Sequence, residues 1–197
     1  MKVPELIFVV GCNAAGKSTF IRSRLSELTG FEIIMTDVYK GRTKEVFTLA
    51  VKQRKDIIIE TVFNDLLFKD LIDLAASAGY HTSLIVLFLD NLTQSKERVA
   101  FRLAQQSGLP VSDGNIKINF EESFKNVTGY YLYFDRSDFI YTGIGGVNRL
   151  IMSFHKDKLV SHVSNDLVYP KRFAEYSYRN HRLSDEAYRA ISGNQNL

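Results

Sequence analysis

The sequence has little cysteine and no long apolar run, and these absences narrow the class of protein. One cysteine among 197 residues cannot form a disulfide within the chain, which suits a reducing compartment, so we expect a cytoplasmic location. No stretch approaches the roughly 18–20 apolar residues of a membrane-spanning helix, and we expect no membrane partner. The net charge of +3 is too small to predict a nucleic-acid partner.

The sequence also has no internal repeat and no low-complexity linker. A chain of this length with 45% hydrophobic residues can bury a sizeable core. We therefore expect one globular domain with appendages.

The stretch VVGCNAAGKSTF, residues 9–20, has two interpretations. Residues 9–12 resemble the cleavage box of a lipoprotein signal, whereas residues 11–18 match the P-loop pattern G-x-x-x-x-G-K-[ST]. A secretory signal needs an apolar stretch of about 7–15 residues, and Pro4 and Glu5 interrupt the approach. The P-loop also accounts for the apolar run before the motif and the helix-compatible sequence after it. We therefore predict a P-loop.

A P-loop binds the phosphates of a nucleoside triphosphate through backbone N–H groups at a helix N-terminus. Lys17 is predicted to reach the β- and γ-phosphates, and Ser18 to place its hydroxyl on Mg²⁺. The predicted cofactors are thus ATP and Mg²⁺. The predicted nucleotide-binding residues are Gly11, Cys12, Asn13, Ala14, Ala15, Gly16, Lys17, Ser18 and Thr19.

Short apolar runs alternate with helix-like segments along the chain. The predicted strands are residues 6–10, 31–35, 56–59, 84–89 and 139–141. The predicted helices between them are residues 18–28, 41–54, 65–78 and 95–106. This alternation predicts a three-layer α/β fold of the P-loop NTPase kind, with a mostly parallel five-stranded sheet. A hairpin is expected around His155 and His162.

Polar residues follow the first strands where the carboxyl ends of a parallel sheet bind ligands. Asp37 and Glu60 would meet the P-loop there. Asp37 taken alone is better explained as a helix N-cap or a loop aspartate, and Glu60 at the matching end of the next strand favours the functional interpretation. Asp90 could support Mg²⁺ through water or form a turn. Arg98 and Arg102 are four residues apart and share a helix face, which suits phosphate binding or a solvated surface.

The order of these motifs resembles the zeta-toxin-like family of small P-loop kinases. The matching pieces after the P-loop and Asp37 are "ETV" at 60–62, "AGYHTSLIVLFLD" at 78–90, "KERVAFRL" at 96–103, "FEESFKN" at 120–126 and "NRLIMSF" at 148–154. The resemblance covers roughly residues 5–160. It implies transfer of a γ-phosphoryl group to a hydroxyl of a small molecule, which in the best-known members is a UDP-linked amino sugar.

The resemblance also implies roles for individual residues. Asp37 resembles the general base, and Arg98 and Arg102 resemble the phosphate-facing arginines of a lid. Glu60 resembles the substrate-binding acid, and Thr61 and Lys117 are the further substrate-binding candidates. An antitoxin-like protein partner is a further implication for a toxin of this family.

The chain departs from the family in the lid, about residues 98–118. Family members have a Gly-Gly-His-type turn and a run of arginines, whereas Leu109 stands at the histidine place and only Lys117 is basic in the run. Lysine does not reproduce the planar fork that arginine offers to phosphate. Residues 165–197 fall outside the resemblance, so we divide the chain into a kinase-like domain, 1–164, and a C-terminal helical appendage.

We interpret the sequence as an ATP-dependent kinase, a phosphotransferase that acts on an alcohol group. The alternative is an ATP-binding switch or weak NTPase that transfers no phosphoryl group, which the altered lid favours. A nucleoside or nucleotide kinase is a third interpretation, and it needs a base-recognition pocket that the sequence does not locate.

Overall fold

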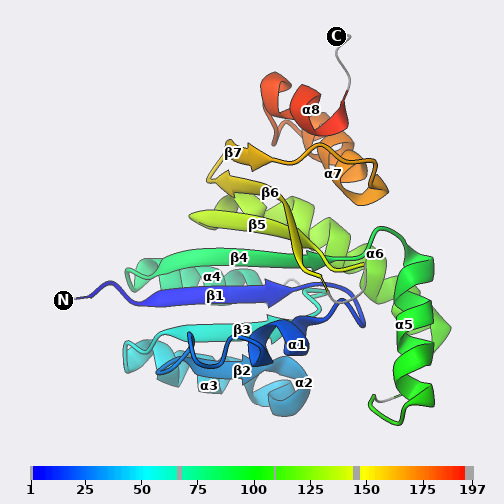
Figure 1. Cartoon of the computed structure of the whole chain (residues 1–197). Helices are drawn as coiled ribbons and strands as arrows, with labels where there is room; N and C mark the ends of the chain where they lie inside the picture. The colour runs from blue at the N-terminus through cyan, green and yellow to red at the C-terminus, as the bar shows by residue number, and fades with distance from the viewer. Residues whose placement is uncertain (1, 66–67, 109, 144–146, 194–197) are drawn as a thin grey trace.

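The computed structural model describes residues 2–65, 68–108, 110–143 and 147–193, and its centre is one β-sheet (Figure 1). Seven strands lie in the order β2-β3-β1-β4-β5-β6-β7. Their bounds are β1 (Glu5–Val10), β2 (Glu32–Met35), β3 (Ile57–Thr61), β4 (His81–Phe88), β5 (Arg136–Tyr141), β6 (Arg149–His155) and β7 (Lys158–His162). The first five strands are parallel, and β6 and β7 are antiparallel additions at one edge.

These two antiparallel strands make the sheet larger than predicted. Our prediction of five strands did not count the hairpin around His155 and His162, which forms β6 and β7. Strand β6 pairs with β5 from Arg136 opposite His155 to Tyr141 opposite Arg149. The hairpin covers the edge of β5, whose N–H and C=O groups would otherwise lack partners. The predicted count of five is therefore wrong, whereas the mostly parallel α/β arrangement is confirmed.

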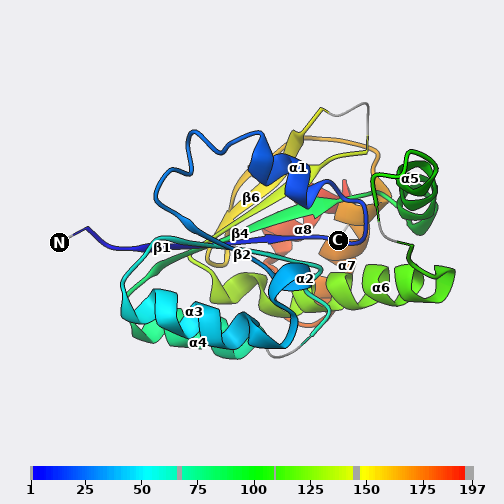
Figure 2. The same ribbon diagram turned by 90° about the horizontal axis from the view of Figure 1, so that it is seen from below.

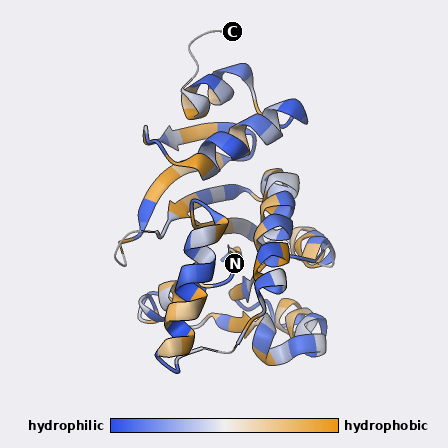
Figure 3. Ribbon diagram, turned by 90° about the vertical axis from the view of Figure 1, so that its right-hand side faces the viewer, coloured by the Kyte–Doolittle hydropathy of each residue, from blue (hydrophilic) through white to orange (hydrophobic). Residues whose placement is uncertain are grey.

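Helices cover both faces of the sheet, giving the predicted three layers. Figure 2 shows α1 on one face and α3, α4 and α6 on the other. Their bounds are α1 (Lys17–Arg22), α2 (Thr36–Tyr39), η1 (Lys40–Arg42), α3 (Thr43–Lys52), α4 (Phe68–Ser77), α5 (Leu92–Ala104), α6 (Asp113–Tyr130), η2 (Tyr131–Tyr133), α7 (Val168–Arg179) and α8 (Asp185–Ser192). The helix ribbons carry both hydrophilic and hydrophobic stretches (Figure 3), as helices do when one side faces a sheet. Within the described ranges, none of the helices combines the length and the apolar character that a membrane crossing requires.

Alternation along the strands decides which side chains face α1. In β3, Ile57 and Ile59 belong to the apolar cluster that includes α3, α4 and α6, whereas Ile58 belongs to the cluster beneath α1. Successive side chains of a strand point to opposite faces. Glu60, two residues after Ile58, therefore faces α1 and the loop that precedes it.

Helix α1 is shorter than the predicted 18–28. It ends at Arg22, and turns follow over residues 23–30. Ser23 Oγ donates to Phe20 O at 2.9 Å, and Thr29 Oγ1 donates to Ser26 O at 3.1 Å. Serine and threonine side chains that bind nearby backbone groups compete with helix continuation.

The segment predicted as a lid, residues 98–118, is mostly helical. It consists of the second half of α5, the start of α6 and the connection 105–112. Leu109, and residues 66 and 67 of the third predicted helix, lie outside the described residues. The lid region therefore presents its arginines from a helix that stands at the carboxyl ends of the strands (Figure 1).

The residues beyond 164 pack against the sheet through α7. The ring centroid of Phe173 lies 4.7 Å from that of Phe139 and 5.1 Å from that of Tyr131. Asp90, which follows β4, accepts a hydrogen bond from Tyr169 N at 2.9 Å through its Oδ1. Asp90 thus anchors the start of α7, and its suggested support of Mg²⁺ through water stays a prediction. The division at 164 stays a prediction.

Replacing Phe173 tests whether α7 belongs to the same cooperative unit as the sheet. Phe173 is fully buried, so Phe173→Ala should lower the free energy of unfolding by about 3–5 kcal/mol. Urea unfolding monitored by circular dichroism gives this value. Glu175→Ala, at an exposed position of the same helix, is the control and should change it by less than about 0.5 kcal/mol. An equally small effect of Phe173→Ala would mean that α7 is an independent appendage.

Candidate active site

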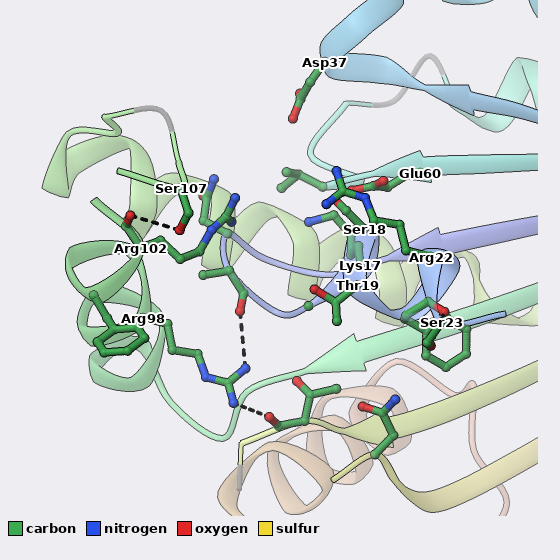
Figure 4. A pocket seen from close by; sticks show the side chains of 18 residues that line it. Lys17, Ser18, Thr19, Arg22, Ser23, Asp37, Glu60, Arg98, Arg102 and Ser107 are labelled. Carbon is green, nitrogen blue, oxygen red and sulfur yellow. Dashed lines mark hydrogen bonds between the residues drawn. The ribbon is translucent and has the colours of Figure 1, made fainter. Parts of the chain in front are cut away.

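A cavity of about 730 Å³ lies at the carboxyl ends of the parallel strands (Figure 4). Its walls come from the P-loop and α1, from Asp37 of α2, from Glu60 of β3, from α5 and from the residues after β5. The structure thus brings most of the predicted site residues to one place. Those that line the cavity are Asn13, Ala14, Gly16, Lys17, Ser18, Thr19, Asp37, Glu60, Arg98 and Arg102.

The P-loop owes its shape to hydrogen bonds on its carbonyl oxygens. Lys17 Nζ donates to Gly11 O at 2.9 Å and to Cys12 O at 3.1 Å. The next three carbonyls accept from side chains outside the loop. These bonds are Ser95 Oγ to Asn13 O (2.8 Å), Arg98 Nη1 to Ala14 O (3.4 Å) and Thr142 Oγ1 to Ala15 O (2.8 Å). Five consecutive carbonyls are therefore occupied, which leaves the loop's N–H groups as its phosphate-binding surface.

The two glycines of the motif are required for different reasons. A Cβ on Gly11 would lie 2.1 Å from Leu87 O, so only glycine lets the loop pass this close to β4. Gly16 precedes α1 with a φ of 92°, in the left-handed region that favours glycine. The motif therefore fixes both the approach of the loop to the sheet and the start of α1.

Lys17 projects from the start of α1 and is half-buried. Burial lowers the pKa of its ammonium group, and the carboxylates of Glu60 and Asp37 oppose this change. Its ammonium is held by two carbonyl oxygens, which are weaker partners than a phosphate. Lys17 is therefore positioned to transfer its hydrogen bonds to an anion that enters the cavity.

Ser18 and Glu60 form a pair that suits a divalent cation. Ser18 Oγ donates to Glu60 Oε1 at 2.7 Å, and the buried Glu60 Oε2 has no hydrogen-bond partner in the described structure. A buried carboxylate oxygen without a partner is costly unless a ligand completes it. Hydroxyl and carboxylate oxygens are ligands that Mg²⁺ accepts, with nucleotide phosphates and water supplying the rest. Among the described residues there is no cluster of three or more histidine, cysteine, aspartate or glutamate side chains that could hold a metal alone.

Asp37 and Arg102 border two cavities. Both line the large cavity and an adjoining one of about 150 Å³, whose further walls include Val99, Gly108 and Val111. Asp37 lies in the first turn of α2, whose N-cap is Met35, so the helix-cap alternative is wrong. In the described part of the chain, neither the Asp37 carboxylate nor the Arg102 guanidinium has a hydrogen bond or an ion pair.

Arg98 has a different environment from Arg102. Its guanidinium donates to the carbonyl oxygens of Ala14 and Thr142, so it joins the P-loop, α5 and the end of β5. Figure 4 shows Arg98 on the side of the cavity away from Asp37, and Arg102 between them. Among the described residues, Arg102 therefore has no partner that would compete with a ligand, whereas Arg98 is already engaged in holding the loop.

Five predicted site residues do not line the cavity. Gly11, Cys12 and Ala15 are buried on the sheet side of the loop. Thr61 is buried, and its hydroxyl accepts a hydrogen bond from Phe63 N at 3.1 Å, which fixes the turn after β3. Lys117 is exposed on α6 away from the cavity walls. The structure therefore gives Thr61 and Lys117 no contact with the space for a substrate.

Sequence reasoning missed other residues that shape the site. Arg22 lines the cavity and lies four residues after Ser18 in α1, a spacing that could have revealed it. Asn119 of α6 donates to Asn13 Oδ1 at 2.8 Å and accepts from Asn64 Nδ2 at 2.7 Å. This amide chain joins the P-loop to the segment after β3, and no local pattern in the sequence indicates it.

The fold is similar to those of solved structures with low sequence identity. A chain of the PezAT chromosomal toxin–antitoxin system of Streptococcus pneumoniae superposes with a TM-score of 0.64 and 13% identity, over 92% of this chain and 88% of that chain. The native AvrRxo1-ORF1:-ORF2 complex gives a TM-score of 0.64 and 13% identity, over 97% of this chain and 75% of that chain. The same complex with ATP gives a TM-score of 0.59 and 12% identity, with the same coverage of the two chains. No protein-family model and no curated protein sequence matches. The predicted resemblance to zeta-toxin-like proteins is thus confirmed for the fold.

Lys17→Ala tests whether the cavity is a nucleotide site. Lys17 supplies the side-chain charge of the P-loop, so its loss should weaken ATP binding more than tenfold, about 1.4 kcal/mol. Calorimetric titration of the folded variant measures the change. Lys52→Ala, at an exposed position of α3, removes the same charge far from the cavity and should leave the affinity unchanged. Unchanged affinity in Lys17→Ala would refute the P-loop assignment.

Proposed function

We propose that this protein is an ATP-dependent kinase that transfers the γ-phosphoryl group to a hydroxyl of a small molecule. The observation that carries the proposal is the position of Asp37. Its carboxylate has no hydrogen bond or ion pair among the described residues, and it borders both the cavity lined by the P-loop and the adjoining cavity of about 150 Å³. An acceptor beside Asp37 would meet a base and the nucleotide phosphates together. The solved ATP complex of similar fold supports ATP as the donor.

The proposed reaction needs positioning and charge stabilisation more than covalent chemistry. Lys17 and the amides of the P-loop hold the phosphates, and Arg102 lies where negative charge develops on the transferred group. Asp37 accepts the proton of the acceptor hydroxyl as the oxygen–phosphorus bond forms. The nucleoside diphosphate leaves with the bridging oxygen and its electron pair.

Glu60 has a proposed role that differs from the one implied by the family resemblance. Ser18 and Glu60 together would hold Mg²⁺, because their oxygens already lie 2.7 Å apart and the second carboxylate oxygen of Glu60 lacks a partner among the described residues. The bound ion would supply positive charge that offsets the charge of the phosphates. Glu60 therefore serves the nucleotide, and acceptor binding falls to other residues.

Glu60→Gln distinguishes a metal role from an acceptor role. Glutamine keeps a carbonyl oxygen for Ser18 but removes the charge, so the Mg²⁺ concentration for half-maximal activity should rise at least about tenfold. ATP affinity without Mg²⁺ should stay unchanged. Ser18→Ala is the matched variant and should shift the Mg²⁺ requirement in the same direction. A raised KM for the acceptor at an unchanged Mg²⁺ requirement would instead assign Glu60 to the acceptor.

One observation favours the alternative of an ATP-binding switch. Arg98 is bound to the carbonyl oxygens of Ala14 and Thr142, so only Arg102 of the two predicted lid arginines is free to stabilise a transferred phosphoryl group. A switch needs no acceptor and no base. Asp37 separates the two functions because only the kinase uses its carboxylate.

Asp37→Asn should leave ATP binding nearly intact and lower phosphoryl transfer by roughly 10²–10⁴-fold, the usual contribution of a positioned acid–base group. ATP titration and transfer assays with hydroxyl compounds measure the two effects. Asp157→Asn, in the exposed turn between β6 and β7, is the control and should be neutral in both. If no compound accepts phosphate and Asp37→Asn keeps the slow hydrolysis of ATP, the protein is a switch.

The comparisons also support the predicted protein partner. One similar structure belongs to a toxin–antitoxin system, and the other belongs to the AvrRxo1-ORF1:-ORF2 complex. An antitoxin-like partner would bind this protein and restrain its activity, and co-expression with the product of a neighbouring gene tests this association.

A further inference from the structure

We infer that Arg22 is a specificity residue of the acceptor site, and that the acceptor carries an anionic group, a phosphate or a carboxylate, beside the hydroxyl that is phosphorylated. This inference rests on the proposed kinase function. It assigns to the cavity a residue that neither the P-loop motif nor the family resemblance identifies.

Arg22 lies on the same side of the cavity as Asp37. It lines the same cavity as Asp37 and Glu60. Figure 4 shows its guanidinium directed toward these two carboxylates, on the side away from Arg98. The strand order explains the separation, because β2 and β3 flank β1 on one side and β4 and β5 flank it on the other. An acceptor whose hydroxyl reaches Asp37 would therefore enter beside Arg22, on the side of the cavity away from Arg98.

In the part of the chain that the structure describes, the guanidinium of Arg22 has no structural partner. Among the described residues it forms no hydrogen bond and no ion pair, although Asp37 and Glu60 share its cavity. The end of α1 does not need it either, because Phe20 O accepts from Ser23 Oγ at 2.9 Å and from Arg24 Nη1 at 3.2 Å. A role as a helix cap is thus already filled by its neighbours.

The chemistry of this group selects the ligand. Guanidinium is always charged and offers a planar fork of N–H donors that matches phosphate and carboxylate oxygens. An anion on the acceptor would place its oxygens on Arg22 while its hydroxyl reaches Asp37, and the two contacts together would fix its orientation. A neutral acceptor would leave Arg22 unpaired beside the reacting groups.

The test uses the full chain, Arg22→Gln, Arg22→Lys and the control Arg24→Gln. Arg24 is two residues away and stacks 3.8 Å over the ring of Phe20, so its replacement removes a similar charge from the same segment without touching the acceptor side. Inorganic phosphate is titrated by calorimetry into protein saturated with Mg²⁺ and a non-hydrolysable ATP analogue. Transfer is then measured with matched compounds: glycerol, glycerol phosphate and glycerate, and uridine and its monophosphate.

We expect phosphate to bind the nucleotide-loaded protein, and Arg22→Gln to weaken this binding at least about tenfold, with a smaller loss in Arg22→Lys. Anionic compounds should be better acceptors than their neutral partners. Arg22→Gln should remove that preference through KM rather than kcat, and Arg24→Gln should keep it. Comparison of phosphate esters with carboxylates identifies which anion the site prefers.

Equal phosphate affinity in Arg22→Gln and the unchanged chain, or an unchanged preference for anionic acceptors, overturns the inference and leaves the kinase proposal intact. Absence of transfer to every compound contradicts the kinase proposal itself. The phosphate titration still decides the anion site in that case, since weakened binding in Arg22→Gln supports the site and unchanged binding overturns it.

Discussion

The site depends on the hydrogen bonds that occupy the carbonyl oxygens of the P-loop. Arg98 and Ser95 come from α5, Thr142 from the end of β5, and Lys17 from the loop's own end. Thr142 is 127 positions from Ala15, so the shape of a short motif is fixed by parts of the chain far away in sequence. The glycines of the motif allow the backbone of the loop to bend, and the hydrogen bonds from α5 and from the end of β5 fix the conformation that it adopts.

Sheet topology then divides the chemistry in space. The acids stand at the ends of β2 and β3, whereas the basic residues of α5 follow β4 on the other side of the loop. The arginines of α5 thus stand across the cavity from Asp37 and Glu60, and no ion pair joins them among the described residues. A nucleotide that enters between them would meet cations on one side and a proton acceptor on the other, and this is the arrangement that supports a kinase.

Sequence patterns predicted the parts of the fold that are local. The apolar run before Gly11 forms β1, and the motif places Lys17 and Ser18 at the cavity, as predicted. Both predictions hold because an apolar run and the spacing of glycines determine the backbone over only a few residues. The sequence did not reveal that the hairpin joins the sheet, because edge pairing is a tertiary contact. Nor did it reveal that Thr61 lies off the cavity wall, where its hydroxyl accepts from the backbone of Phe63. Whether a polar side chain contacts a ligand or another part of the protein depends on its neighbours in space, and the spacing of residues in the sequence does not predict these neighbours.

Cys12 gives the P-loop a built-in chemical reporter. It is the single cysteine of the chain and is buried behind the loop, and burial raises the pKa of its thiol. A buried, protonated thiol reacts slowly with alkylating reagents, so modification requires the loop to leave the sheet. The rate of labelling at this one sulfur therefore reports how often the loop opens, without any engineered probe, and every ligand that tightens the loop should protect it.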